Sequence, residues 1–458
     1  MTLRTILAAA LLTAATPVLA QPAKTPAPDD MASFDKELDA LFTPGGLTSD
    51  QAASKAASVS PSVARSAAEI EAAIAQTETA ELARVPQVGA KAAYTRLSHI
   101  DTPDLMGFTL PIFFNVYTVQ GQIGVPLSDY LLRFPTIIDA AKLGVEAAKT
   151  GQKSAEVNAG QDARVAYYEW VRARLQVLIA QRQLAQVQTT LKQVRALAEV
   201  QRLSRADLMR VESNEAQADQ AVIQLQHLAA LREEQLRLLI GAKEGDSLAI
   251  GEDIRQDITA PQSSPVDALM DIAKKQRLEF KAIDIGIAAK EKQRDAEAAR
   301  KYPVLSAFAA GEYTNPNQRI FPAKDTFTFT WSVGAQLTWT LNDALTARAT
   351  DRRIRAEANE LRADRENLER GTRIQVLAAQ QAVEIATASL ATTKKGLAAA
   401  EEGYRVRREL LNAERATAVE LVDAETDLTR ARIAALNARV DLRVAQAQLA
   451  HALGNDTK

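Results

Sequence analysis

The sequence predicts a membrane protein of mixed α and β structure, in which transmembrane strands are joined to very long coiled-coil helices and the whole unit is duplicated in tandem. Three observations predict this fold class. One strand-like stretch alternates strictly between apolar and small polar residues, a similar stretch occurs in the first half of the chain, and proline is absent from two long parts of the chain.

The N-terminal part of the chain predicts a targeting segment followed by a proline-rich segment. Residues 1–20 have the form of a signal peptide, with a positive charge at Arg4, an apolar core over residues 6–15 and a cleavage site ending at Ala20. Residues 21–61 contain five prolines and predict an extended segment with at most a short helix near residues 31–42. After residue 20 no run approaches the roughly 18 apolar residues of a membrane helix, so we expect no α-helical span in the mature chain.

The strand-like stretch is Phe327–Leu341, with the sequence FTFTWSVGAQLTWTL. Every odd position is apolar and every even position is Thr, Ser, Gly or Gln, so a strand here has one apolar face and one small polar face. That pattern is typical of a transmembrane β-barrel strand with aromatic residues near both membrane surfaces. For this stretch alone, a half-buried strand of a soluble sandwich is the alternative.

The first copy of this pattern spans residues 117–127 and predicts a tandem duplication. Leu127 and Leu341 end the two copies, and later landmarks such as Ile240-Gly241 and Leu453-Gly454 are separated by nearly the same interval. We therefore expect residues 62–244 to be a first structural repeat and residues 265–456 a second, joined by a linker over residues 245–264. Each repeat is expected to contain a helix, two strands, a long helix and a further helix.

Two proline-free stretches, residues 136–260 and 323–458, predict uninterrupted helices. Residues 344–411 have no turn signal, and a helix over them is about 100 Å long at about 1.5 Å per residue. Such a rod must pack along its length against other helices. Leucine and alanine alternate at 3,4 spacing in a coiled-coil stripe: Leu421, Ala424, Leu428, Ala431, Ala435, Ala438, Leu442, Ala445, Leu449 and Ala452. Taken alone, these helices would also fit a periplasmic adaptor.

Five short motifs give the chain a resemblance to the TolC-type outer-membrane efflux proteins across residues 60–456. They are Ala166-Tyr167-Tyr168, the segment 203–208 (LSRADL), Tyr302-Pro303-Val304-Leu305, Trp331-Ser332-Val333-Gly334 and the segment 416–424 (ATAVELVDA). The resemblance implies a homotrimer in which each protomer contributes four strands to one transmembrane β-barrel, which the helices continue as a hollow periplasmic tube. It also implies an outer-membrane location, in contact with lipid.

The family resemblance implies candidate site residues at the helix tips. Acidic residues narrow the periplasmic entrance in this family, and Glu420 and Asp423 hold the matching positions three residues apart on one helix face. Asp207 matches an acidic position that can tether a neighbouring helix, with Arg205, Arg408 or Arg415 as partners. Ordinary solvated acids on a helix face are the alternative for each.

Two features of the tips depart from the family pattern. Ala416 stands where some relatives carry a gating arginine, so that latch is not expected here. The stretches 200–203 and 412–415 lack the glycine that family tips usually carry, and Asn412 could supply the left-handed conformation instead. We therefore expect tips whose shape differs from the family norm.

The aromatic residues of the strands are candidates for contact with lipid or with the membrane surface. They are Tyr117, Phe327, Phe329, Trp331 and Trp339. Packing in a protein core is the alternative for these side chains.

Charge and composition exclude several classes of function. The 55 Lys+Arg residues are balanced by 57 Asp+Glu, so no basic surface for nucleic acid is expected. The chain has no cysteine, which excludes disulfides, a lipidated cysteine and thiolate sites, and its three histidines lack metal-ligand spacing. No catalytic motif is found, so we expect neither an enzyme nor a cofactor; an outer-membrane enzyme is the weakest alternative.

The resemblance therefore implies an outer-membrane exit channel of a tripartite efflux pump or type I secretion system. Such a channel is a passive conduit that a periplasmic adaptor (membrane fusion protein) and an inner-membrane transporter open. A periplasmic coiled-coil adaptor or scaffold without a channel is the alternative. Drugs, metal ions and a secreted polypeptide all remain possible cargo.

Overall fold

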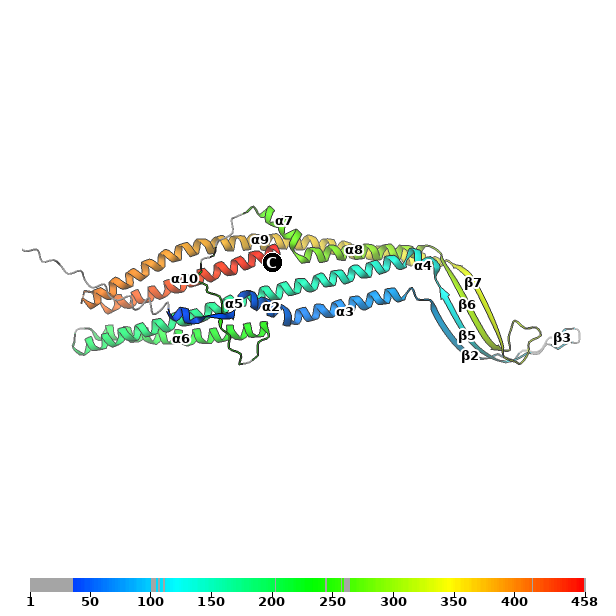
Figure 1. The fold of residues 1–458 in the computed structure, drawn as a ribbon, viewed down its shortest axis with the longest axis horizontal. Coiled ribbons are helices and arrows are strands. Elements are labelled where there is room, and N and C mark those ends of the chain that lie inside the picture. Colours follow the sequence, from blue (N-terminus) through cyan, green and yellow to red (C-terminus); the bar gives the residue numbers. More distant parts are fainter. Residues whose placement is uncertain are drawn as a thin grey trace, which may run out of the picture.

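The computed structural model describes residues 36–99, 104–105, 108–109, 112–201, 203–243, 245–256, 258, 264–413 and 415–456. The signal peptide expected at residues 1–20 lies outside them. The molecule is elongated, with a β-sheet at one end and helices running along the long axis to the other end (Figure 1).

One antiparallel sheet contains the four strands that the sequence predicted as two pairs. Its strands are β2 (Gln87–Arg96), β5 (Asn115–Val125), β6 (Val304–Asn315) and β7 (Thr328–Thr338), in the order β2-β5-β6-β7. Strands β5 and β6 pair across the two halves of the chain, and β2 and β7 form the two edges. A separate hairpin, β3 (Asp104–Leu105) with β4 (Phe108–Thr109), lies beyond the sheet (Figure 1).

The helices follow the same order in the two halves of the chain. The first half contains α3 (Pro61–Leu82), α5 (Phe134–Glu199) and α6 (Arg205–Ile240), and the second contains α8 (Leu278–Ala298), α9 (Leu341–Asn412) and α10 (Ala418–Leu453). Shorter elements are α4 (Leu127–Leu132), α7 (Val266–Gln276) and the 3₁₀ turn η1 (Ala299–Lys301). The long helix expected at residues 344–411 is confirmed, because α9 has 72 residues.

The last helix of each half begins and ends with matching caps. The hydroxyls of Ser204 and Thr417 accept the backbone N–H three residues ahead, which fixes where α6 and α10 begin. Gly241 and Gly454 end these helices in the left-handed conformation, with φ of 64° and 75°. Both kinds of cap recur at one common interval along the chain, and the paired sequence motifs recur at nearly the same interval.

The largest core lies halfway along the helices and includes a segment that the sequence analysis did not predict. Residues 21–61 were expected to be extended with at most a short helix near residues 31–42. Residues 36–41 are helical, but the segment also contains strand β1 (Phe42–Leu47) and helix α2 (Ser49–Val59), which were not expected. Thr48 and Gln51 form a capping box that starts α2, and Ala52 and Ala56 bury its inner face in the core that also holds Trp170 of α5. The alanine-rich helix lacks a strong apolar stripe, so only the tertiary contact reveals it.

Strand β1 is fastened to the segment after α6 by a contact between two glycines. The backbone N–H of Gly251 donates to Leu47 O at 2.8 Å, and a Cβ on Gly251 would lie 2.2 Å from Gly46 O. No side chain fits there without moving the backbone.

We therefore expect Gly251→Ala to lower the free energy of unfolding by about 1–3 kcal/mol, as overpacking does. Gly151→Ala in α5 is the matched control, because open space surrounds that Cβ position and alanine favours a helix. Thermal unfolding, together with limited proteolysis of residues 36–59, measures the difference. Equal proteolysis of the two variants would contradict the contact.

Candidate functional site

The sheet has one face of exposed apolar side chains. Residues Ala90, Gly121, Gly311 and Trp331 are register partners across the four strands, and alternate residues on either side of this row share their face. The Trp331 side chain is 69% exposed and that of Val333 is 70% exposed. The other exposed large apolar residues of this face are Val88, Tyr94, Tyr117, Val119, Ile123, Leu305, Tyr313, Phe329 and Leu337. A patch of this size needs an apolar environment.

The opposite face of the sheet is mainly polar or small. Lys91, Gln120, Glu312 and Thr330 are register partners and form one row across all four strands. A neighbouring row contains Gln122 and Ser332. Two charged side chains in one row are compatible with water on this side and not with hydrocarbon.

Aromatic residues mark both ends of the apolar face. At the end far from the helices, the Phe327 ring lies 5.1 Å from the Tyr313 ring and 6.1 Å from the Tyr117 ring. At the end near the helices, Trp339 Nε1 donates to Lys301 O at 3.3 Å. Aromatic side chains thus lie near both ends of this face, as the pattern of residues 327–341 predicted. The contact with lipid predicted for Tyr117, Phe327, Phe329, Trp331 and Trp339 stays a prediction.

At the opposite end of the molecule, the tips are the turns that join α5 to α6 and α9 to α10 (Figure 1). The first tip contains Gln201 in the left-handed conformation, with φ of 57°. Asn412, for which the sequence suggested that conformation, is instead the last residue of α9. The missing glycine is therefore replaced by a glutamine in the first tip.

Glu420 and Asp423 each pair with an arginine of a different helix. Glu420 Oε2 lies 2.6 Å from Arg407 Nη1 of α9, so this pair closes the second tip. Asp423 Oδ1 lies 3.3 Å from Arg210 Nη2 of α6, so this pair joins the two halves of the chain. All four side chains are about half exposed, and pairs of this kind contribute only about 0–1 kcal/mol each. They can therefore break at little cost.

Asp207 has a local role in the structure. Ser204 donates its hydroxyl to Asp207 Oδ2 at 2.7 Å, and the Asp207 N–H donates back to Ser204 Oγ at 3.1 Å. The residue thus completes the first turn of α6, where Arg205 is the first residue. The latch between Asp207 and an arginine such as Arg205 stays a prediction.

A buried acid in α10 is not among the site residues predicted from the sequence. Glu425 is 1% exposed, and Thr190 of α5 donates its hydroxyl to Glu425 Oε1 at 2.7 Å. Burial raises the pKa of Glu425 to about 7, although the Thr190 bond lowers it. A sequence signal existed: the acid stands four residues after Leu421 and three before Leu428, so it belongs to the apolar face of the stripe.

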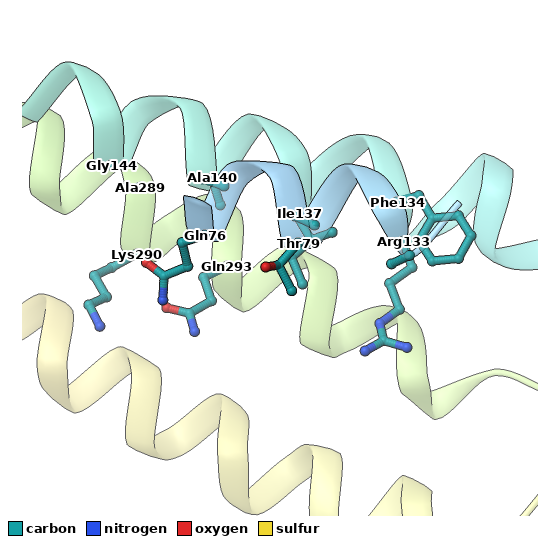
Figure 2. Close-up of a pocket in the computed structure, with 13 residues that line it drawn as sticks. Gln76, Thr79, Arg133, Phe134, Ile137, Ala140, Gly144, Ala289, Lys290 and Gln293 are labelled. Atoms are coloured by element: carbon teal, nitrogen blue, oxygen red, sulfur yellow. The ribbon is translucent and has the colours of Figure 1, made fainter. Parts of the chain in front are cut away.

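A cavity of about 600 Å³ lies between α3, α5 and α8 (Figure 2). Small side chains such as Ala140, Gly144 and Ala289 leave this space. Lys290, Gln293 and Gln76 extend their polar ends along one side of it (Figure 2). Its lining contains no acid, histidine or cysteine.

Two further properties of the described residues concern metal binding and membrane helices. They contain no group of three or more metal-binding side chains. None of the helices in this part of the chain is long and apolar enough to cross a membrane.

Comparison with known proteins gives a family match for one part of the chain and a fold for most of it. Residues 269–455 match the model of the outer membrane efflux protein family. CusC, described with transmembrane channel formation, is 16% identical with a TM-score of 0.74 over 90% of this chain and 93% of its own. The Campylobacter jejuni outer membrane channel CmeC is 13% identical with a TM-score of 0.73, over 92% and 87%.

The open state of the Neisseria gonorrhoeae outer membrane channel MtrE is 17% identical with a TM-score of 0.72, over 89% of this chain and 88% of its own. No curated protein sequence matches the chain. The resemblance to the TolC-type outer-membrane efflux proteins is therefore confirmed: residues 269–455 carry the sequence pattern of the outer membrane efflux protein family, and the chain has the fold of its channels.

Proposed function

We propose that the protein is the outer-membrane exit channel of a tripartite efflux pump or type I secretion system. The single observation that carries this function is the sheet with an exposed apolar face and a polar opposite face, placed at one end of helices of 66 and 72 residues. The sheet supplies a wall between lipid and water, and the helices supply a tube that reaches far into the periplasm.

The two open edges of the sheet support a trimeric barrel. Strands β2 and β7 have unpaired backbone groups on their outer sides, and such edges cannot remain exposed in a bilayer. Four strands are too few to close around a channel, whereas three protomers supply twelve strands and pair every edge. The matching order of elements and caps in the two halves supports an origin by tandem duplication.

The alternative of a periplasmic adaptor or scaffold explains less of the structure. A soluble scaffold would leave Trp331, Val333 and the rest of the apolar face in water, which is costly over so large an area. It would also leave unexplained why Lys91 and Glu312 share the other face.

In the proposed mechanism the channel is passive and its tips form the gate. The ion pairs of Glu420 and Asp423 hold α10 to α9 and α6, and they break when a periplasmic adaptor and an inner-membrane transporter engage the tips. In the trimer these carboxylates come from three protomers at one entrance, where they favour cations. Asp207 and Arg205 belong to the same moving tips.

We expect the purified protein to be a trimer in detergent, because only neighbouring protomers can pair the two sheet edges. Light scattering coupled to gel filtration gives the mass of the particle, and migration that changes on heating in gels reports the barrel. A monodisperse monomer with an intact β signal would contradict the proposed channel and favour the scaffold.

A further inference from the structure

The buried acid Glu425 lies at the contact between the two halves of the chain, one turn from the core of the tips. That core contains Leu191 and Val194 of α5, Val211 of α6, and Ala418 and Val422 of α10. Glu425 faces the same way as Val422 along α10, and its partner Thr190 is the residue before Leu191 on α5. Both members of this hydrogen bond are buried, with Thr190 only 4% exposed. This hydrogen bond therefore lies at the edge of the apolar contact between α5 and α10.

One oxygen of Glu425 has no partner. Glu425 Oε2 is buried and makes no hydrogen bond, whereas Oε1 accepts from Thr190. This site can hold a protonated carboxyl, because a neutral O–H group costs far less free energy to bury than a charge does. An ionised carboxylate has too few donors here and is destabilised.

Next to Glu425 lies a cavity of about 530 Å³ between α5, α9 and α10. Its titratable groups besides Glu425 are Arg182 from α5 and Tyr404 and Arg408 from α9. Arg182 also contacts Glu37 Oε1 at 3.1 Å, and the Arg408 guanidinium lies 5.5 Å from the centre of the Tyr404 ring. An ionised Glu425 can leave Thr190, rotate into this space and meet water and these guanidinium groups.

The other charged groups of the tip are already engaged elsewhere. On α10 itself, Glu420 pairs with Arg407, and Asp423 pairs with Arg210 of α6. The pKa of Glu425 is raised by burial and lowered only by its Thr190 bond, so nearby charge does not set it. Among the described residues at this contact, Glu425 is the buried acid whose pKa burial raises toward neutral pH.

We propose that Glu425 and Thr190 form a proton-operated catch that holds α10 against α5 in the resting tip and releases it when Glu425 ionises. The catch rests on the proposed channel function and adds a control by the pH of the periplasm. The direction of the pH effect follows from the difference in the pKa of Glu425 between the packed and the released tip. The packed tip raises the pKa of Glu425 from an ordinary 4.5 to about 7, so protonation stabilises the packed tip fully below about pH 4.5, and this stabilisation is lost as the pH rises through 7.

Distances between spin labels on the two helices test the catch, and this measurement does not depend on whether the protein conducts ions. The chain has no cysteine, so Lys192→Cys on α5 and Arg430→Cys on α10 give two labels at exposed positions. We expect a narrow distance distribution at pH 5.5 and a broader or longer one at pH 8, with the ratio of packed to released tips changing on the order of tenfold per protomer.

Two variants in the labelled background identify Glu425 as the cause. Glu425→Gln imitates the neutral carboxyl at nearly the same size, so its distances should be narrow at both pH values. Thr190→Val removes the bond that stabilises the ionised form, so the midpoint of the change should move to higher pH. Infrared difference spectra between pH 8 and 5.5 should also show a buried carboxyl band that Glu425→Gln lacks.

The outcomes separate this inference from the proposed function. If Glu425→Gln keeps the pH response of the unsubstituted chain, or if the carboxyl band remains in it, the catch is wrong. If the label distances respond as expected while planar bilayers show no conductance at any pH, the catch stands and the channel fails. If the catch and the channel function are both correct, the unsubstituted channel conducts more at pH 8 than at pH 5.5, and Glu425→Gln removes that difference.

Discussion

Val333→Arg and Trp331→Arg should each prevent most of the protein from assembling in the outer membrane. Val333 is the central residue of β7, and Trp331 precedes it on the same apolar face. An arginine facing lipid costs about 2–4 kcal/mol at the middle of the bilayer and less toward its surfaces. Each trimer would carry three such charges, so the loss should be large for Val333→Arg and somewhat smaller for Trp331→Arg.

Ser332→Arg and Thr330→Arg are the matched controls, because they put the same charge on the same strand but on the polar face. Thr330 shares its row with Lys91 and Glu312, so a further charge there stays in water. Ser332 is the cleaner control, since the Thr330 hydroxyl also lies 3.4 Å from Asn317 Nδ2. Outer-membrane fractionation and heat-modifiable migration measure assembly. Equal assembly of all four variants would show that the two faces of the sheet are assigned wrongly.

The strands and long helices could be predicted because their signals are local. Alternation at period two in residues 327–341 is visible without any partner, and it locates β7 to within a few residues. The lack of proline and of turn signals over residues 344–411 locates α9 in the same way. Helix α2 could not be predicted, since its alanines are buried by contacts with α5 and α6, which both follow much later in the chain.

The tips were harder to predict because their partners are remote in sequence. The sequence shows that Glu420 and Asp423 share a helix face, but Arg210 lies in the other half of the chain and no local pattern joins it to Asp423. The burial of Glu425 could not be predicted for a different reason. An acid beside an apolar stripe looks like a solvated residue at its edge, and only the fold shows that the carboxyl is buried against Thr190.

Neutralising Glu420 and Asp423 together should reduce the preference of the channel for cations. The variant Glu420→Gln with Asp423→Asn removes up to six negative charges from the entrance of a trimer while side-chain size changes little. We expect the cation-to-anion permeability ratio to fall by about two- to threefold and block by multivalent cations to weaken, because both depend on converging carboxylates.

The arginine partners give an opposite and matched test. Arg407→Gln with Arg210→Gln leaves the two carboxylates without their ion pairs, so cation preference and multivalent block should rise. Planar-bilayer recordings at 0.1 M and 1 M salt separate entrance charges from distant ones, since the Debye length falls from about 10 Å to about 3 Å. A narrow ring of carboxylates acts on ions at contact distance, so its effect should persist at 1 M. If both double variants match the unsubstituted channel in selectivity and block at both salt concentrations, these residues lie on an outer face and the gate is elsewhere.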